Sequence, residues 1–246
     1  MAELRLLQLS DCHLSADPEA RYRGQDADAG LAAMVEAASS FAPDALVLTG
    51  DLAEDGSPAA YARLVERLSD LSLPVAWLPG NHDEREVMQQ PFEAAGFLAG
   101  PLLDWGGWQI ALLDSTWPGR HDGEVDESRL AVLEELDDSR PAAVFIHHQP
   151  VAARARWIDK VALVDGESFQ ARVAGSRAVR LVAFGHVHQA YRRQVDKVSY
   201  LAAPSTVANS LPGTDKFTLD PGGPAARWFV LRADGSFDTG ILGSGQ

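Results

Sequence analysis

Short apolar runs separated by longer stretches are the feature that most limits how this chain can fold. The runs are too short for buried helices, and they predict strands that are covered on both faces. They span residues 4–9, 45–49, 75–78, 109–114, 142–146, 179–184, 198–202 and 227–231. Helical patterns lie between the early runs, and strands that alternate with helices favour a largely parallel sheet. The sequence therefore predicts an α/β fold.

Three helices are predicted between these strands. The first two are indicated by apolar residues at i, i+3, i+4 and i+7, which are Leu31, Met34, Val35 and Ala38 in one and Tyr61, Leu64, Val65 and Leu68 in the other. Ser57 and Pro58 supply an N-cap and a first-turn proline for the second helix. The third is predicted over residues 126–138, with Asp126 as its capping residue.

Length and composition bound the domain organisation. A chain of 246 residues with 46% hydrophobic side chains can bury one large core, so we expect a single domain over residues 1–246. Residues 209–224 are rich in Gly and Pro, which predicts a surface loop. The sequence shows neither an apolar run of membrane-spanning length nor a signal-peptide pattern. Cys12 is the only cysteine, and we expect a cytoplasmic protein without disulfides.

The chain is acidic, with a formal net charge of −14 at pH 7. This charge argues against nucleic-acid polymers and anionic membranes as partners, because both are bound through broad basic faces. It also opposes an anionic substrate, unless bound cations reverse the sign of the local field.

Polar side chains gather directly after five of the predicted strands. Six of the seven histidines fall in these positions, and only His121 does not. Ligands of open α/β sheets bind at the carboxyl ends of strands, so we expect these side chains to lie in one place. The residues are Asp11 and His13, Asp51, Asn81 with His82 and Asp83, His147 with His148, and His186 with His188.

This set of carboxylates, one carboxamide and several imidazoles suits Mn, Fe or Zn, whereas structural zinc sites are usually rich in cysteine. Each motif alone has a structural explanation: Gly-Asp after a strand is a common turn, and paired histidines can bond to backbone. Together they offer too many ligands for one tetrahedral site. Two ions about 3.5–4 Å apart would use them all, and such a pair is suited to phosphoester hydrolysis. The pair would also offset part of the negative charge.

The stretch Gly185-His186-Val187-His188 supports two ions rather than one. If it stays extended, we expect that one ion cannot readily take both imidazoles. We therefore expect His186 at one ion and His188 at the other.

At these residues the sequence resembles the calcineurin-like metallophosphoesterase superfamily. The family pattern is D-x-H, GD-x-x-(x)-D/E, GNH-D/E, a histidine before a short polar turn, and GH-x-H. It is matched by residues 11–13, 50–55, 80–83, His147 and residues 185–188. The resemblance covers residues 4 to about 210. It implies a four-layer α/β/β/α sandwich of two mixed β-sheets flanked by helices, with the site at the carboxyl ends of the central strands.

The resemblance also implies roles for individual residues and two divalent or mixed-valence metal ions, drawn from Fe, Mn and Zn. One ion would be held by Asp11, His13, Asp51 and His188, and the other by Asp51, Asn81, His147 and His186. Asp51 would bridge both ions together with a hydroxide that attacks phosphorus in line. His82 would protonate the leaving group or bind a phosphate oxygen. Asp83 would orient His82 or raise its basicity.

The segment after His147 resembles the bacterial class III cyclic-nucleotide phosphodiesterases, through Trp157-Ile158-Asp159 and Pro204-Ser205-Thr206. Gln149 replaces the first proline of their HHPP motif. We expect hydrolysis of 3′,5′-cyclic AMP-type nucleotides or a related small phosphodiester, such as a glycerophosphodiester. The alternatives are a phosphomonoesterase, a nucleotide-pyrophosphate hydrolase, or a non-catalytic metal-containing scaffold.

Three questions stay open on the sequence. A homodimer is compatible with it, but no motif settles the oligomeric state. His148 fits either a contact to the substrate or a structural hydrogen bond. The cluster of Arg154, Arg156 and Lys160 fits either a phosphate-attracting border of the site or a solvated loop.

Overall fold

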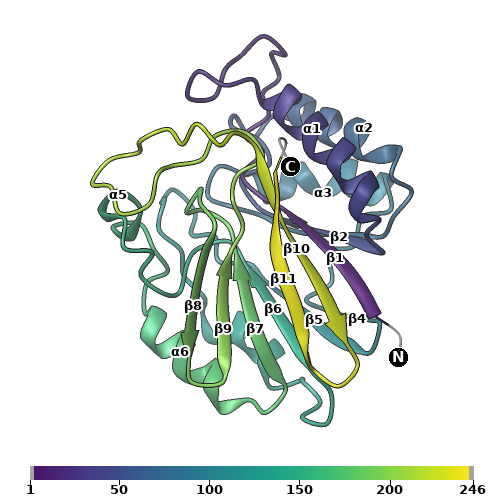
Figure 1. Ribbon diagram of the computed structural model, residues 1–246, viewed down its shortest axis with the longest axis vertical. Coiled ribbons are helices and arrows are strands. Elements are labelled where there is room, and N and C mark those ends of the chain that lie inside the picture. The colour runs from purple at the N-terminus through teal and green to yellow at the C-terminus, as the bar shows by residue number, and fades with distance from the viewer. Residues whose placement is uncertain (1–2, 244–246) are drawn as a thin grey trace.

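Two β-sheets packed face to face form the centre of the computed structural model, which describes residues 3–243 (Figure 1). The first sheet has the order β11-β10-β1-β2-β3, and the second has the order β4-β5-β6-β7-β9-β8. Strands of the first sheet are β1 (Glu3–Leu9), β2 (Ala45–Thr49), β3 (Val75–Leu78), β10 (Ala225–Arg232) and β11 (Phe237–Gly243). Those of the second are β4 (Leu102–Trp105), β5 (Trp108–Leu113), β6 (Ala142–Ile146), β7 (Val179–Phe184), β8 (Tyr191–Val195) and β9 (Val198–Ala202).

Both sheets are mixed: the first is antiparallel at its β11 edge and parallel at its β3 edge, and the second is antiparallel at both edges. The pairs β1–β2 and β2–β3 are parallel, as are β5–β6, β6–β7 and β7–β9. The strands β10, β11, β4 and β8 pair antiparallel with their neighbours. The expectation of two mixed sheets is confirmed, and the parallel strands all deliver their carboxyl ends to the same end of the molecule.

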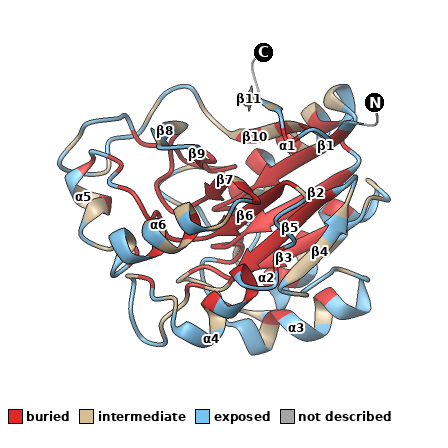
Figure 2. Ribbon diagram, turned by 90° about the horizontal axis from the view of Figure 1, so that it is seen from below, coloured by how far each residue is buried: buried red, intermediate tan, exposed pale blue. Residues whose placement is uncertain are grey.

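Helices cover the outer face of each sheet, which completes the four layers. The helices α1 (Ala27–Phe41), α2 (Pro58–Ser69) and α3 (Arg85–Ala94) pack on the first sheet. The shorter α4 (Glu127–Leu130), η1 (Ala131–Leu133), α5 (Arg156–Asp159) and α6 (Gly166–Gly175) lie against the second. Burial follows these layers: strands are buried along most of their length, and the helices expose their outer faces (Figure 2).

The layer between the sheets is filled by large apolar side chains. Trp108, Phe145 and Phe229 are fully buried there, and Phe145 meets Phe229 edge to face with ring centroids 6.0 Å apart. Each such side chain contributes about 1.5–3 kcal/mol by leaving water. This rigid centre holds the strand ends in place.

Helix caps agree with the sequence, but one helix is shorter than predicted. Ser57 Oγ accepts a hydrogen bond from the Ala60 amide, and Asp126 accepts one from the Arg129 amide. The helix predicted over residues 126–138 ends after α4 and the 3₁₀ turn η1. Residues 134–138 read Glu-Glu-Leu-Asp-Asp, and carboxylates at a helix carboxyl end oppose its dipole.

Several elements were not predicted: β4, β8, β11, α3, α5 and α6. Within residues 3–243, no helix combines the length and the apolar character that crossing a membrane requires.

Candidate metal centre

The polar residues after β1, β2, β3, β6 and β7 lie together at the carboxyl ends of these strands. Three groups of buried side chains bring their ligand atoms within 4.8 Å of one another: Asp11, His13 and His188; Asp11, Asp51 and His147; and His147, His148 and His186. Asn81 joins them, with its Oδ1 3.3 Å from His147 Nε2. The strand ends that the sequence singled out therefore form one cluster.

Two buried carboxylates occupy the middle of the cluster. Asp51 Oδ2 lies 3.4 Å from His147 Nε2 and 3.9 Å from His13 Nε2. It therefore stands between the two halves of the cluster, one with His13 and His188 and the other with His147 and His186. Asp11 Oδ1 lies 3.2 Å from His188 Nε2. Burial raises the pKa of both carboxyl groups, but the neighbouring imidazoles lower it by a larger amount. The net pKa of each carboxyl group therefore falls below its ordinary value. Both side chains are therefore anionic at neutral pH.

Four imidazoles are oriented by oxygen acceptors outside the cluster. His147 Nδ1 lies 2.7 Å from the Thr49 carbonyl oxygen, His188 Nδ1 lies 2.7 Å from that of Ala208, and His186 Nε2 lies 3.0 Å from that of Val161. His13 Nδ1 is 2.7 Å from Glu54 Oε2. Because these oxygens only accept, the ring nitrogens facing them carry the protons. In the neutral ring the other nitrogen is then a lone-pair donor, as metal-binding histidines require.

This arrangement fits a metal centre and is unfavourable without one. His13 Nε2 and His188 Nε2 lie 3.2 Å apart, and the carbonyl and carboxylate contacts leave a lone pair on each. Two facing lone pairs repel unless a cation lies against both. His147 differs: burial lowers its pKa, but the charge and hydrogen bond of Asp51 raise it to a net value of about 9, so without a cation Nε2 carries a proton toward Asp51. The donor set is imidazole, carboxylate and carboxamide, which suits Mn, Fe or Zn.

The backbone of the cluster is left-handed where the sequence predicted an extended chain. His186 has φ 66° and His188 has φ 50°, so Gly185–His188 does not continue β7. Asp11, His13 and Asp51 also have positive φ, of 54°, 45° and 51°. An extended segment would have placed residues two positions apart on the same face of the strand. The tight left-handed turns instead direct His186 toward His147 and His188 toward His13.

His82 lies at the edge of the cluster, and its side chain is 29% exposed. Its Nδ1 is 3.2 Å from Glu54 Oε2, the oxygen that also contacts His13. Partial burial lowers the pKa of His82, but the Glu54 hydrogen bond and the Asp51 and Glu54 charges raise it to a net value of about 9. Burial raises the pKa of Glu54, and the bonds from His13 and His82 bring it down to about 2.

The expectation that Asp83 orients His82 is wrong, and Glu54 has that position. The Asp83 carboxylate accepts hydrogen bonds from the amides of Gly80, Leu52 and Ala53 and from the Tyr61 hydroxyl. These contacts tie the loop after β3 to the loop after β2, which makes Asp83 a structural residue. Sequence reasoning passed over Glu54, although it stands at the acidic position of the motif after Asp51.

His148 has a structural hydrogen-bond pattern. Its Nδ1 lies 2.8 Å from Ser115 Oγ, and its Nε2 lies 3.2 Å from the His121 carbonyl oxygen. Burial and the neighbouring imidazoles hold its pKa well below the ordinary value, so the ring is neutral. Both nitrogens are thus engaged with oxygens outside the cluster.

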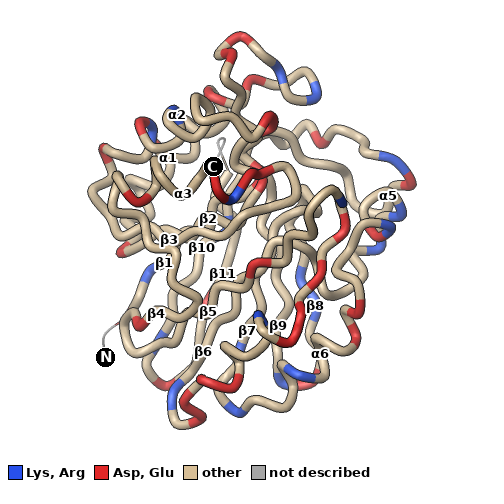
Figure 3. Tube along the Cα trace, turned by 180° about the vertical axis from the view of Figure 1, so that it is seen from behind, with Lys and Arg blue, Asp and Glu red and all other residues tan. Residues whose placement is uncertain are grey.

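The basic cluster of Arg154, Arg156 and Lys160 is exposed, on and beside α5 (Figure 3). Within residues 3–243 these three side chains form no ion pair. They therefore stand as solvated charges.

Two loops and the short helix α5 place aromatic side chains beside the cluster. The Tyr22 ring stacks on His13 with centroids 3.8 Å apart, and the Arg23 guanidinium lies 3.9 Å from the Phe217 ring centroid. Trp157 meets Phe217 edge to face at 5.4 Å. A cavity of about 330 Å³ opens here, between His82 and Glu54 on one side and Tyr22 and Arg23 on the other.

Comparison with known proteins gives consistent matches over nearly the whole chain. The family model described as calcineurin-like phosphoesterase matches residues 4–190. A 3′,5′-cyclic adenosine monophosphate phosphodiesterase, CpdA, of Pseudomonas aeruginosa is 37% identical over 245 residues, which cover 98% of this chain and 90% of that protein. The CpdA of Escherichia coli K12 is 34% identical, with 98% and 90% covered.

Solved structures show the same fold at lower identity. A dimetal phosphatase from Danio rerio superposes with a TM-score of 0.69 at 14% identity, covering 98% of this chain and 99% of the other. Purple acid phosphatase PPD1 from yellow lupin gives a TM-score of 0.68 at 13% identity, covering 98% of this chain and 54% of the other.

Proposed function

This chain belongs to the calcineurin-like phosphoesterase family, and we propose that it is a metal-dependent phosphodiesterase that hydrolyses 3′,5′-cyclic nucleotides. The observation that carries the proposal is the buried contact of His13 Nε2 with His188 Nε2 beside the Asp11 carboxylate, while the opposite ring nitrogens face oxygens outside the cluster. The substrate class is supported by the relatives, two of which are named 3′,5′-cyclic AMP phosphodiesterases.

Two metal ions from the group Fe, Mn and Zn would be held by the cluster. Asp11, His13, Asp51 and His188 would hold one, and Asp51, Asn81, His147 and His186 the other. Such ions supply Lewis acidity and charge neutralisation to a phosphoester at neutral pH. Cys12 is excluded as a ligand because its side chain is fully buried in the apolar layer under α1 and α2, where burial raises the pKa of the thiol to about 12.

His82 is the proton donor of the proposed reaction. Its Nδ1–H bonds to Glu54, which leaves Nε2 as the second proton-bearing atom on the exposed side of the cluster. With a pKa of about 9, the ring is cationic at neutral pH. It can therefore bind a phosphate oxygen and then deliver a proton to the departing ribose oxygen, while Glu54 holds the imidazolium in place.

The nucleoside part of the substrate is proposed to occupy the cavity between His82 and Tyr22. Its volume of about 330 Å³ adjoins the proton donor, so a phosphodiester at the cluster places one arm there. Arg21 and Arg23 line the cavity and counter the negative charge of the chain beside an anionic substrate.

The test combines elemental analysis with a substrate panel. We expect about two ions per chain, and faster hydrolysis of cyclic AMP and bis(p-nitrophenyl) phosphate than of AMP and p-nitrophenyl phosphate. A metal-replete protein that prefers the two monoesters would refute the phosphodiesterase assignment. A protein that holds metal but hydrolyses no phosphoester of the panel would instead indicate a binding scaffold.

Substitution Arg23→Ala tests the placement of the nucleoside. We expect KM for cyclic AMP to rise about tenfold, because the Arg23 guanidinium lines the cavity and one contact to a charged group is worth roughly 1.5 kcal/mol. KM for bis(p-nitrophenyl) phosphate should change less than about threefold. Lys160→Ala removes an exposed charge near α5 and is the matched control. Equal effects of Arg23→Ala on both substrates would contradict the placement.

Substitution Glu54→Gln tests how His82 keeps its proton. Removing the Glu54 charge lowers the pKa of His82 from about 9 toward its ordinary value. We therefore expect the alkaline limb of the kcat profile to move down by about one to two pH units, measured from pH 6 to 10. Asp55→Asn is the control, because the neighbouring carboxylate bonds Ser15, Ala16 and Ser57 instead. An unmoved alkaline limb in Glu54→Gln would assign the proton to another group.

A further inference from the structure

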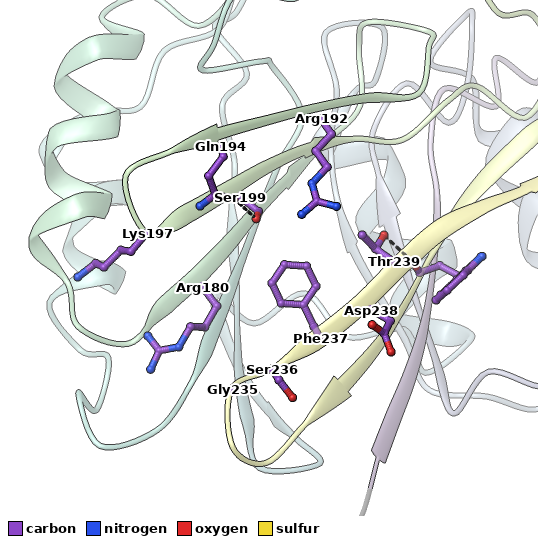
Figure 4. A pocket seen from close by; sticks show the side chains of 11 residues that line it. Arg180, Arg192, Gln194, Lys197, Ser199, Gly235, Ser236, Phe237, Asp238 and Thr239 are labelled. Atoms are coloured by element: carbon purple, nitrogen blue, oxygen red, sulfur yellow. Dashed lines mark hydrogen bonds between the residues drawn. The ribbon is translucent and has the colours of Figure 1, made fainter.

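A second cavity, of about 700 Å³, opens at the side of the sandwich, away from the metal cluster (Figure 4). Its walls are β7, β8 and β9 of the second sheet and β10, through Trp228, and β11 of the first. The cavity lies at the amino end of β7, where Arg180 lines it, whereas His186 of the metal cluster follows the carboxyl end of β7. At about 3.3 Å per residue, the two ends are roughly 20 Å apart. The groove is therefore a separate site.

The inner face of the second sheet changes from apolar to polar at this groove. Leu181 and Leu201 face the first sheet and belong to the core between the sheets. Farther along the same face the inward positions are Ser199 on β9 and Arg192 and Gln194 on β8. Polar side chains in place of core residues leave the groove unfilled and lined with hydrogen-bond donors.

The positive charges of the groove have no carboxylate partner among the described residues. Arg192 forms no hydrogen bond or ion pair within residues 3–243. Arg180 and Lys197 donate only to backbone carbonyls, those of Arg177, Ala178 and Ser176. The one acidic side chain in the wall, Asp238, is paired with Arg232. In a chain of net charge −14, these cations give the groove a positive lining.

A buried guanidinium lies directly behind the wall. Arg227 is only 5% exposed, and it donates to the carbonyls of Ala202 and Tyr191 and to Thr239 Oγ1, again without a carboxylate. Burial and then the charge of Arg192 lower its pKa to about 10, so it stays charged at neutral pH. Arg192 and Arg227 thus repel each other, and an anion in the groove would relieve that repulsion.

An aromatic ring completes the lining. Phe237, at the start of β11, projects its ring into the groove between the side chains of Arg180 and Arg192 (Figure 4). Only Trp108 meets it among the aromatic side chains of the described residues, edge to face at 6.4 Å. A planar group can therefore lie against Phe237 while an anionic group contacts the two guanidinium groups.

We propose that this groove is a second ligand site that binds a nucleotide, with its phosphate on Arg192 and Arg180 and its base against Phe237. Guanidinium groups match the paired oxygens of a phosphate, and stacking on an aromatic face is open to any base. This inference goes beyond the proposed function, because the groove shares no residue with the metal cluster and the binding involves no hydrolysis.

Equilibrium dialysis of labelled AMP against the full-length, metal-replete protein tests the proposal. At saturation, we expect the unaltered protein to bind one more AMP per chain than the double variant Arg180→Gln/Arg192→Gln. Affinity of the groove for AMP should fall about 10–100-fold with each single substitution, as for a hydrogen bond to a charged group. The Asp51→Asn protein should still bind AMP in the groove, which separates this site from the metal cluster.

Two further variants sharpen the result. Arg193→Gln is the matched control, because Arg193 lies next on β8 and its side chain lines a different cavity. Phe237→Leu should weaken AMP binding while leaving binding of pyrophosphate, which has no ring, within about twofold. Unchanged AMP stoichiometry in Arg180→Gln/Arg192→Gln, or an equal loss in Arg193→Gln, would overturn the proposal. All groove variants should hydrolyse bis(p-nitrophenyl) phosphate at the unaltered rate, which verifies their fold.

Discussion

Substitution Asp51→Asn lowers turnover of a phosphodiester by about 10²–10⁴-fold, as expected from the loss of several kcal/mol of metal-mediated stabilisation. Asp51 Oδ2 is the oxygen that lies between His13 Nε2 and His147 Nε2, so an amide there removes the negative charge that faces both imidazoles. Asn can still accept the His82 amide bond that Asp51 Oδ1 accepts at 2.9 Å. The chain should therefore fold, and its metal content, measured by elemental analysis, should fall below that of the unaltered protein.

Asp83→Asn gives the contrasting result. Its carboxylate accepts backbone amides and a tyrosine hydroxyl, and an amide group cannot accept from all of them. The expected loss is about 1–3 kcal/mol in the free energy of unfolding, with metal content per folded chain retained. If Asp51→Asn kept full metal and activity while Asp83→Asn lost its metal, the roles assigned to these two carboxylates would have to be exchanged.

Substitution His82→Gln separates proton transfer from metal binding. For cyclic AMP, whose leaving ribose oxygen must be protonated, kcat should fall about 10²–10⁴-fold. For bis(p-nitrophenyl) phosphate, whose phenolate leaves without a proton, the loss should stay below about tenfold. The ratio of the two effects is the informative quantity, because a purely structural defect would lower both rates alike.

Metal content is the control for His82→Gln. His82 lies at the partly exposed edge of the cluster and bonds Glu54 through Nδ1. The four imidazoles proposed as ligands belong to other residues: His13, His147, His186 and His188. We expect the same number of ions per chain as in the unaltered protein. Loss of metal in this variant, with equal losses on both substrates, would make His82 a ligand rather than a proton donor.

The fold was predictable where strands are buried on both faces. The runs at 45–49, 75–78, 142–146, 179–184 and 198–202 coincide with β2, β3, β6, β7 and β9, because burial on both sides makes such strands continuously apolar. The strand β8 reads Tyr-Arg-Arg-Gln-Val, and β11 contains two glycines, so neither carries that signal. Both form as edge strands because β9 and β10, respectively, supply the backbone hydrogen-bond partners.

The site was predictable from strand ends but not from its supporting contacts. Asp11, His13, Asp51, Asn81, His147, His186 and His188 converge because parallel strands bring their carboxyl ends together. The partnership of Glu54 with His82, and that of Asp83 with Tyr61, depends on how separate loops pack, and adjacency in sequence suggested the opposite pairing. The left-handed turns at His186 and His188 were likewise not predicted, because the segment after β7 was predicted to be extended.

Those left-handed turns have an evolutionary consequence for the choice of metal. Among residues other than glycine, Asn, Asp and His adopt positive φ most readily, and β-branched side chains are excluded. Asp11, His13, Asp51, His186 and His188 can thus exchange among these three types with little backbone strain. A lineage built on this scaffold can drift between harder, oxygen-rich and softer, nitrogen-rich ligand sets, and so between metals, by single substitutions. Cysteine is not among these three residue types, so a thiolate-rich metal centre cannot be reached by such exchanges.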